Sequence, residues 1–193
     1  MPHDKNSATW LRLDNVTKPA PKIAQMWDES QKRLGYVREF LKMPFEPDRL
    51  ALFQGYVNRL MRSDDCKLSG RERELIALVV SLENRCEACI ITHAGALEAH
   101  GMDKRNADVL LANWRRAELT DRERALAEFA SNLTLHCVMA SEDDLDALRV
   151  AGVREEEILE VVQIVAIFNA TNRLNAGLGI KVDDGAHDAL RKA

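Results

Sequence analysis

The distribution of proline is the feature that most limits what this chain can fold into. All five prolines lie within the first 47 residues, and the remaining 146 residues contain none. Proline breaks an α-helix because it lacks an N–H group and its ring clashes with the preceding turn, so the proline-free part can be helical throughout. No segment shows the alternation of apolar and polar residues that is typical of a half-buried β-strand. The sequence therefore predicts an all-α fold, a multi-helical bundle.

The positions of the expected helices follow from proline and from the spacing of apolar residues. We expect one helix from about residue 21 and another over about residues 47–62, each with proline in its first turn. A long helix over about residues 154–178 includes "ILEVVQIVAIF", in which apolar residues occupy nearly every face. We expect this helix to be buried all round, at the centre of the bundle or in a subunit contact. The apolar stripe of the second helix comprises Leu50, Leu52, Phe53, Val57, Leu60 and Met61.

Length and charge narrow the class of protein. The chain has 193 residues, 46% of them hydrophobic, which predicts one globular domain over residues 1–193 with residues 1–20 as an N-terminal arm. A net charge of -4 leaves no broad basic surface, so nucleic acid is not an expected partner. The apolar run over residues 158–168 is too short to cross a membrane. The first residues lack the apolar segment of a secretory signal, so we expect a cytoplasmic protein with reduced thiols.

An internal repeat with an offset of 51 residues begins at Leu68. The segment "LSGREREL" at residues 68–75 returns as "LTDRERAL" at 119–126, and "ALEAHG" at 96–101 returns as "ALRVAG" at 147–152. Ser69 followed by Glu72 predicts a capping box at a helix start, and Gly101 and Gly152 are placed to end helices in the left-handed conformation. The sequence thus predicts two related helical units, over residues 68–118 and 119–169.

The stretch "NRCEACIITHAG" at residues 84–95 gathers candidate chemistry in the first unit. We expect one helix over residues 72–82, a break at 83–85 and a second helix over 86–100. On that second helix Cys86, Cys89 and His93 fall within about 60° of one another, so both thiols and the imidazole share a face. The positive end of the helix dipole favours a thiolate in the first turn. Each of these residues alone is compatible with a buried helix face, but the C-x-x-C spacing also suits redox chemistry.

A metal site is a further reading of the same residues. Zinc would need a fourth ligand beyond Cys86, Cys89 and His93, and the sequence has no second C-x-x-C or H-x3-H. The side chains that could be recruited are those of Glu74, His100 and Cys137. Attachment of a c-type haem is excluded because isoleucine, not histidine, follows the second cysteine. We therefore expect neither a metal nor another cofactor.

The spacing of these residues resembles a family signature. Glu74, Cys86, Cys89 and His93 follow the E-x11-C-x-x-C-x3-H pattern of the alkylhydroperoxidase D-like family, in the carboxymuconolactone decarboxylase-like superfamily. The segments "LSGRERELIALVVSLENRCEACIITHAGAL", "LTDRERALAEFA" and "IFNATNRL" resemble its peroxidase-related branch, over about residues 20–180. The resemblance implies an all-helical homo-oligomer that reduces hydroperoxides with its cysteines and takes electrons from a dithiol or lipoyl-type donor. The best-studied branch has a second histidine where this chain has Ala88.

The resemblance also implies a role for each residue of the signature. Cys89 would attack the hydroperoxide and Cys86 would then form a disulfide with it. His93, one turn after Cys89, would take the thiol proton, and Glu74 would orient His93. The helix dipole alone favours Cys86 as the attacking thiolate, because Cys86 is nearer the helix N-terminus.

The repeat predicts that this chemistry belongs to the first unit only. On the 51-residue offset, Glu74, Cys89 and His93 correspond to Ala125, Ala140 and Asp144, whereas Cys86 corresponds to Cys137. We expect Cys137 to be a core cysteine. Cys66 follows Asp64 and Asp65, whose charges disfavour a thiolate, so we expect it to be inert.

Two other functional classes stay open at this point. A decarboxylase or other enzyme acting on a carbon acid would use Glu74 and His93 as acid and base, without the cysteines. A non-catalytic redox sensor or oligomeric scaffold would oxidise slowly and would not turn over with any donor.

Overall fold

The computed structural model describes residues 9–13 and 16–186. The expected N-terminal arm therefore lies partly outside the described residues, because it includes residues 1–8 and 14–15. Its described part is tied to the rest of the chain by two backbone hydrogen bonds. Trp10 N donates to Leu178 O at 2.9 Å, and Val16 N donates to Lys42 O at 2.9 Å.

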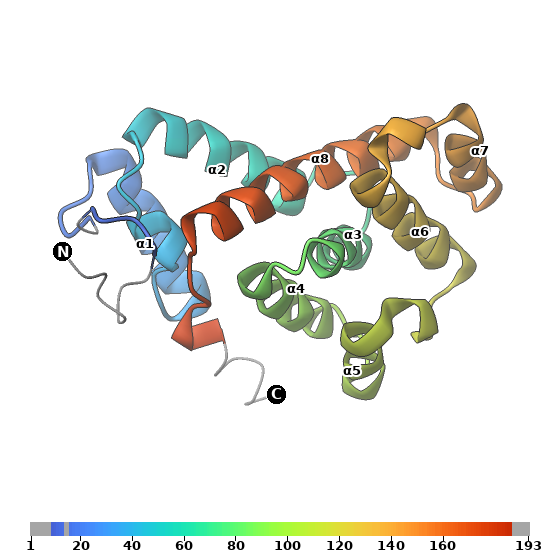
Figure 1. Cartoon of the computed structure of the whole chain (residues 1–193), viewed down its shortest axis with the longest axis horizontal. Helices are drawn as coiled ribbons and strands as arrows, with labels where there is room; N and C mark the ends of the chain where they lie inside the picture. The colour runs from blue at the N-terminus through green and yellow to red at the C-terminus, as the bar shows by residue number, and fades with distance from the viewer. Residues whose placement is uncertain (1–8, 14–15, 187–193) are drawn as a thin grey trace.

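The prediction of an all-α fold is confirmed, since the described residues form helices and no strand (Figure 1). Pro21 and Pro47 open their helices as predicted. None of the helices in the described ranges combines the length and the apolar character needed to cross a bilayer. The α-helices are α1 (Pro21–Leu34), α2 (Pro47–Arg62), α3 (Gly70–Glu83), α4 (Glu87–Ala99), α5 (Lys104–Asn113), α6 (Asp121–Leu135), α7 (Glu142–Val150) and α8 (Glu155–Leu178). Short 3-10 helices are η1 (Glu39–Lys42), η2 (Trp114–Arg116) and η3 (Cys137–Met139).

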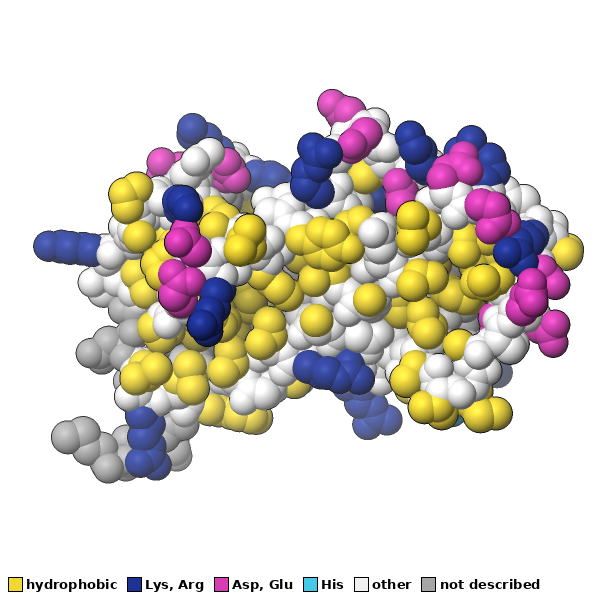
Figure 2. Space-filling view, turned by 90° about the horizontal axis from the view of Figure 1, so that it is seen from above, with side chains coloured by type: hydrophobic (Ala, Val, Ile, Leu, Met, Phe, Trp, Pro, Cys, Tyr) yellow, Lys and Arg dark blue, Asp and Glu magenta, His cyan; other side chains and the backbone are white. Residues whose placement is uncertain are grey.

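Helix α3, and not α8, is the helix that the others enclose. Residues 75–80 of α3 are all buried, and the helix packs against α4, α6 and α8 (Figure 1). The prediction that α8 is buried at the centre of the bundle is wrong, whereas its burial in a subunit contact stays a prediction. One face of α8 packs on α3, α6 and α2, but Leu159 on another face is 61% exposed. Figure 2, which is seen from above Figure 1, shows many hydrophobic side chains on this side of the molecule.

Helix α2 differs from its prediction at one position. Leu50, Leu60 and Met61 are buried and Phe53 packs against the core, but Leu52 is 76% exposed. At about 100° per residue, Leu52 lies about 200° from Leu50 and so faces away from the core.

The two repeat units each contain three α-helices, although their short 3-10 helices lie at different places. The first unit contains α3, α4 and α5, and the second contains α6, α7 and α8. Gly101 and Gly152 have φ of 85° and 80°, so both take the left-handed conformation that was predicted. The capping box of Ser69 is confirmed, and Thr120 forms the equivalent box with Glu123 at the start of α6.

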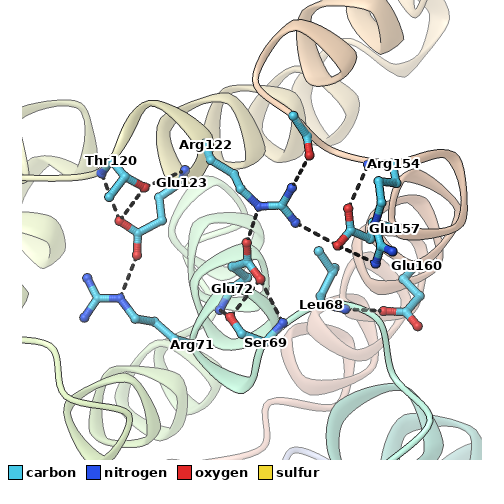
Figure 3. Close-up of polar contacts among 11 residues, drawn as sticks. Leu68, Ser69, Arg71, Glu72, Thr120, Arg122, Glu123, Arg154, Glu157 and Glu160 are labelled. Atoms are coloured by element: carbon cyan, nitrogen blue, oxygen red, sulfur yellow. Dashed lines mark hydrogen bonds and ion pairs between the residues drawn. The ribbon is translucent and has the colours of Figure 1, made fainter.

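Charged side chains at the starts of α3 and α6 exchange partners between the units (Figure 3). Arg71 Nε lies 2.6 Å from Glu123 Oε1, and Arg122 Nε lies 2.6 Å from Glu72 Oε1. Arg71 and Arg122 are 51 residues apart, as are Glu72 and Glu123, so the two ion pairs are equivalents that cross between the units. Arg122 also lies 3.1 Å from Glu157 of α8, whose side chain is only 7% exposed. These contacts tie α3, α6 and α8 together at one end.

We expect Arg122→Met to lower the free energy of unfolding at pH 7 by about 1–3 kcal/mol, because Glu72 and Glu157 lose a partner while mostly buried. Urea denaturation measures the effect. The matched control Arg59→Met removes an exposed pair with Asp65 and should change stability much less.

The pH dependence of this difference gives a second test. Burial alone raises the pKa of Glu157, but Arg154 and Arg122 lower it to about 2, below its ordinary value of 4.5. Stabilisation by Arg122 is therefore present above pH 4.5 and is lost as the pH falls toward 2. A difference between wild type and Arg122→Met that grew on acidification would contradict this account.

Candidate active site

The turn between α3 and α4 fixes the first cysteine of the candidate site. Arg85 has φ of 54°, a left-handed conformation that is uncommon for a residue other than glycine. Arg85 N donates to Leu82 O at 3.1 Å and Cys86 N donates to Ser81 O at 3.0 Å, the two hydrogen bonds of a Schellman motif. Cys86 is therefore itself the N-cap of α4, which begins at Glu87, one residue after the predicted start. Two helix ends hold this cysteine in place.

The two thiols of the motif lie together in a buried pair. Cys86 is 5% exposed and Cys89 is 6% exposed, and the two side chains are hydrogen-bonded to each other. Asn175 of α8 donates from Nδ2 to Cys89 Sγ at 3.1 Å and lies 3.8 Å from Cys86 Sγ. Sequence reasoning did not find Asn175. Asn175 is one of several polar residues in α8, and its partners are 86 and 89 residues away in the chain, so nothing in the sequence singled it out.

The hydrogen bonds within the pair divide the thiols into a stronger and a weaker acid. The hydrogen bond from Cys89 lowers the pKa of Cys86 to about 6, against the effect of burial, and Asn175 and the charge of His93 add to this. The pKa of Cys89 is raised well above its ordinary value by the hydrogen bond to Cys86 and by burial. Near neutral pH the pair therefore holds one negative charge, and that charge resides mainly on Cys86.

The imidazole and the carboxylate of the motif also meet. His93 Nδ1 lies 2.6 Å from Glu74 Oε2, so α3 provides the carboxylate and α4 the imidazole. Burial alone would raise the pKa of Glu74, but the facing His93 brings it below its ordinary value. The rings of Phe168 and His93 pack nearly perpendicular to each other, with centroids 4.6 Å apart. With Nδ1 engaged by Glu74, Nε2 is the nitrogen left for proton transfer.

A cavity of about 580 Å³, which we call the thiol cavity, gives access to these groups. Glu74, Cys89, His93 and Asn175 line it, whereas Cys86 does not. Ala88, at the position of the second histidine in the best-studied branch, lines it as well. A small molecule in the cavity would thus meet Cys89 before Cys86.

Three further residues were named from the sequence as possible ligands or thiols: His100, Cys137 and Cys66. His100 lines the thiol cavity. Cys137 is exposed, so the prediction of a core cysteine is wrong; α6 ends at Leu135, and Cys137 begins the short turn η3. Cys66 is half-buried, near the carbonyl oxygens of Arg59 and Leu60. No three His, Cys, Asp or Glu side chains are placed to hold a metal ion within the described ranges.

The second unit has a different cavity at the equivalent place. Ala140 and Asp144, the counterparts of Cys89 and His93, line a space of about 340 Å³ beside α6. At these two positions the second unit has neither thiol nor imidazole.

Comparison with known proteins gives the chain two matches to one family model. The model of the carboxymuconolactone decarboxylase family matches residues 47–114 and again residues 106–181. The chain matches none of the curated proteins at significant similarity.

Several solved structures have the same fold. A peroxidase-related protein from Silicibacter sp. TM1040 is 29% identical, with a TM-score of 0.88 over 95% of this chain and 96% of that chain. A peroxidase-related protein from Ralstonia eutropha JMP134, described as an alkylhydroperoxidase AhpD core, is 26% identical. Its TM-score is 0.85, over 93% of this chain and 95% of that chain. The debrominase Bmp8 is 17% identical and shares the fold, with a TM-score of 0.77 over 95% of this chain and 98% of that chain.

We expect the thiolate absorbance at 240 nm to rise with pH around a midpoint near 6. The measurement uses the variant Cys66→Ala/Cys137→Ala, which leaves only the buried pair. Asn175→Ala removes the donor to both sulfurs and should move the midpoint up by about one pH unit.

The matched control is Asn172→Ala, which changes a buried asparagine one turn earlier on α8 whose side chain bonds Ser81. A thiolate midpoint near 8.5 in the Cys66→Ala/Cys137→Ala protein would contradict this account of Cys86. So would an equal shift of the midpoint in Asn175→Ala and Asn172→Ala.

Proposed function

The chain belongs to the carboxymuconolactone decarboxylase family, and from this and its likeness to peroxidase-related proteins we propose that it is a thiol-dependent hydroperoxide reductase. One observation carries the proposal. Cys89 lines a cavity together with His93 and Glu74, while the more acidic Cys86 lies behind it within hydrogen-bonding distance. Such a pair has an accessible thiol to meet the oxidant and a charged partner to close a disulfide.

In the proposed reaction Cys89 attacks the terminal oxygen of the hydroperoxide. His93 takes the Cys89 proton as the sulfur–oxygen bond forms, and returns it to the alkoxide that leaves when the O–O bond breaks. The products of this step are an alcohol and a sulfenic acid on Cys89. Glu74 orients His93 and stabilises its charged form while it holds the proton.

In the second step Cys86 resolves the sulfenic acid. The Cys86 thiolate attacks the Cys89 sulfur, a disulfide forms and the S–O bond breaks. The hydroxide that leaves takes a proton from solvent and becomes water. A dithiol donor then reduces the disulfide and is itself oxidised, which returns both cysteines to their starting state.

A second candidate rests on the Glu74–His93 pair. This pair is complete without the cysteines, at 2.6 Å, and could act as acid and base on a carbon acid, as the name of the family suggests. The two candidates differ in what the double variant Cys86→Ser/Cys89→Ser does. This double variant should abolish the activity if the protein is a peroxidase, but leave the activity intact if the protein is a carbon-acid enzyme.

Intact mass spectrometry of the reduced protein, after one equivalent of cumene hydroperoxide, tests the proposed order of attack. Wild type should lose the mass of two hydrogen atoms as a disulfide forms between Cys86 and Cys89, and a dithiol should reverse the change. The variant Cys86→Ser should accumulate a sulfenic acid on Cys89, because its resolving partner is absent. A sulfenic acid on Cys86 in the variant Cys89→Ser, formed as fast as the wild-type disulfide, would reverse the order. Unchanged thiols in the wild type would reject the peroxidase.

We expect Glu74→Gln to slow disulfide formation by about 10- to 100-fold and His93→Gln by about 10²- to 10⁴-fold, the usual range for loss of a general base. Stopped-flow mixing with cumene hydroperoxide measures the rate. The control Glu98→Gln changes a glutamate of α4 that does not line the thiol cavity. If Glu74→Gln had the wild-type rate, the carboxylate would have no part in the chemistry.

A further inference from the structure

The thiol cavity carries more positive than negative side chains, although the chain as a whole has a net charge of -4. Two carboxylates line the cavity, those of Glu74 and Asp183. Five cationic side chains line it: Arg33, Arg38, Arg62, Arg73 and Lys181. The lining of the cavity is therefore locally positive in a protein that is acidic overall.

The four arginines of the cavity form no ion pair with any carboxylate of residues 9–13 and 16–186. Their hydrogen bonds go to neutral groups. Arg38 Nη2 donates to Gln54 Oε1 at 2.9 Å, Arg73 Nη1 donates to Leu68 O at 2.9 Å, and Arg62 donates to the Asn58 side chain. This contrasts with Arg71 and Arg122 at the starts of α3 and α6, each of which has a carboxylate partner.

The two carboxylates of the cavity are already engaged. Glu74 faces His93, and Asp183 Oδ1 accepts a hydrogen bond from Glu39 N at 2.6 Å. The charge of Glu29 acts on Arg62, but no ion pair joins the two. Nothing in the described part of the chain neutralises the arginines by direct contact.

The arginines also repel one another. Loss of surrounding water lowers the pKa of Arg38 and Arg33, and the charge of Arg38 lowers that of Arg33 further. Loss of water and the charges of Arg33 and Arg38 lower the pKa of Arg62 to about 10. All three remain charged near neutral pH. The charge of Asp183 raises the pKa of Arg38, and that of Glu74 raises the pKa of Arg33 and Arg62, so the carboxylates offset part of this repulsion from a distance. A cluster of like charges that is only partly compensated within the fold is stabilised when an anion binds to it.

The cluster reaches the reacting sulfur. The charge of Arg38 lowers the pKa of Cys89. The Nε atom of Arg38 is buried without a hydrogen-bond partner. An anionic group held by this guanidinium would lie in the same cavity as Cys89. Large apolar side chains also line the cavity, those of Phe40, Phe53, Val57, Met61 and Phe168, beside polar ones such as Gln54 and Thr171. The cavity thus suits a molecule with an apolar body and an anionic group.

We infer that the thiol cavity selects organic hydroperoxides that carry a carboxylate, with Arg33, Arg38 and Arg62 as the carboxylate-binding side chains. That the ligand carries a peroxide group rests on the proposed function. That it carries a carboxylate rests on the arginine cluster. Guanidinium groups bind carboxylates through paired, charge-assisted hydrogen bonds. The apolar body would pack against the phenylalanines, and the peroxide group would face Cys89.

The first experiment tests the anion site without redox chemistry. Isothermal titration calorimetry of the fully reduced protein compares 4-isopropylbenzoate with the uncharged 4-isopropylbenzamide. We expect the benzoate to bind at least about tenfold more tightly, on the scale of a charge-assisted hydrogen bond. Arg33→Gln and Arg62→Gln should each weaken benzoate binding about 5- to 10-fold. The matched control Arg105→Gln removes an exposed arginine of α5, outside the thiol cavity, and should leave binding unchanged.

The second experiment tests the substrate class. Intact mass spectrometry and stopped-flow mixing compare cumene hydroperoxide with its para-carboxylate derivative, which differs by the charged group alone. The carboxylated peroxide should form the Cys86–Cys89 disulfide about tenfold faster at low concentration, and Arg33→Gln/Arg62→Gln should remove that advantage. The control Arg105→Gln, outside the thiol cavity, should react with both peroxides at the wild-type rates.

The outcomes separate this inference from the proposed function. Equal binding of benzoate and benzamide, together with rapid oxidation by both peroxides at one rate, would overturn the inference and leave the peroxidase intact. Arginine-dependent binding of benzoate without oxidation by either peroxide would support the anion site and reject the hydroperoxide as its ligand. Equal loss of benzoate binding in Arg105→Gln would show a general charge effect and would overturn the assignment to the cavity.

Discussion

Helix α3 has to meet two opposing demands, and the packing of the other helices depends on how it meets them. Residues 75–80 are buried, so α4, α6 and α8 must surround the helix. Its first turns nevertheless carry Arg71, Glu72 and Glu74, whose charges are costly to bury without partners. Arg71 and Glu72 pair with α6, and Glu74 pairs with His93 of α4. One helix therefore joins the two units at its beginning and supplies the carboxylate of the candidate site.

The electrostatics of the site has two separate sources. Cys86 ends one helix and begins the next, where a hydrogen bond from Cys89 and the amide of Asn175 favour its thiolate. The four arginines line the thiol cavity together with Cys89, whereas Cys86 does not line it. The thiolate is thus stabilised mainly by hydrogen bonds within the core, which leaves the guanidinium groups free to bind a ligand.

Local features were predictable from the sequence, and long-range contacts were not. Helix limits depend on neighbouring residues such as the prolines, Ser69 and Gly101, and the E-x11-C-x-x-C-x3-H spacing lies within 20 residues. Asn175 meets the thiols across more than 80 residues, and the cavity arginines come from α1, α2, α3 and the segment between α1 and α2. The exposure of Cys137 depends on where α6 ends, and that of Leu52 on the angle at which α2 packs. No periodicity in the sequence encodes these tertiary contacts.

The crossed ion pairs at the starts of α3 and α6 bear on how the chain folds. In repeat proteins whose units only stack, stability is roughly a sum over units, and one end can unfold before the other. Here each unit provides the arginine for the glutamate of the other unit's capping box, and α8 of the second unit packs on α3 of the first. Neither unit can lose its structure without removing partners from the other. We therefore expect the two units to unfold together, so the internal repeat creates a single cooperative fold and not two independent halves.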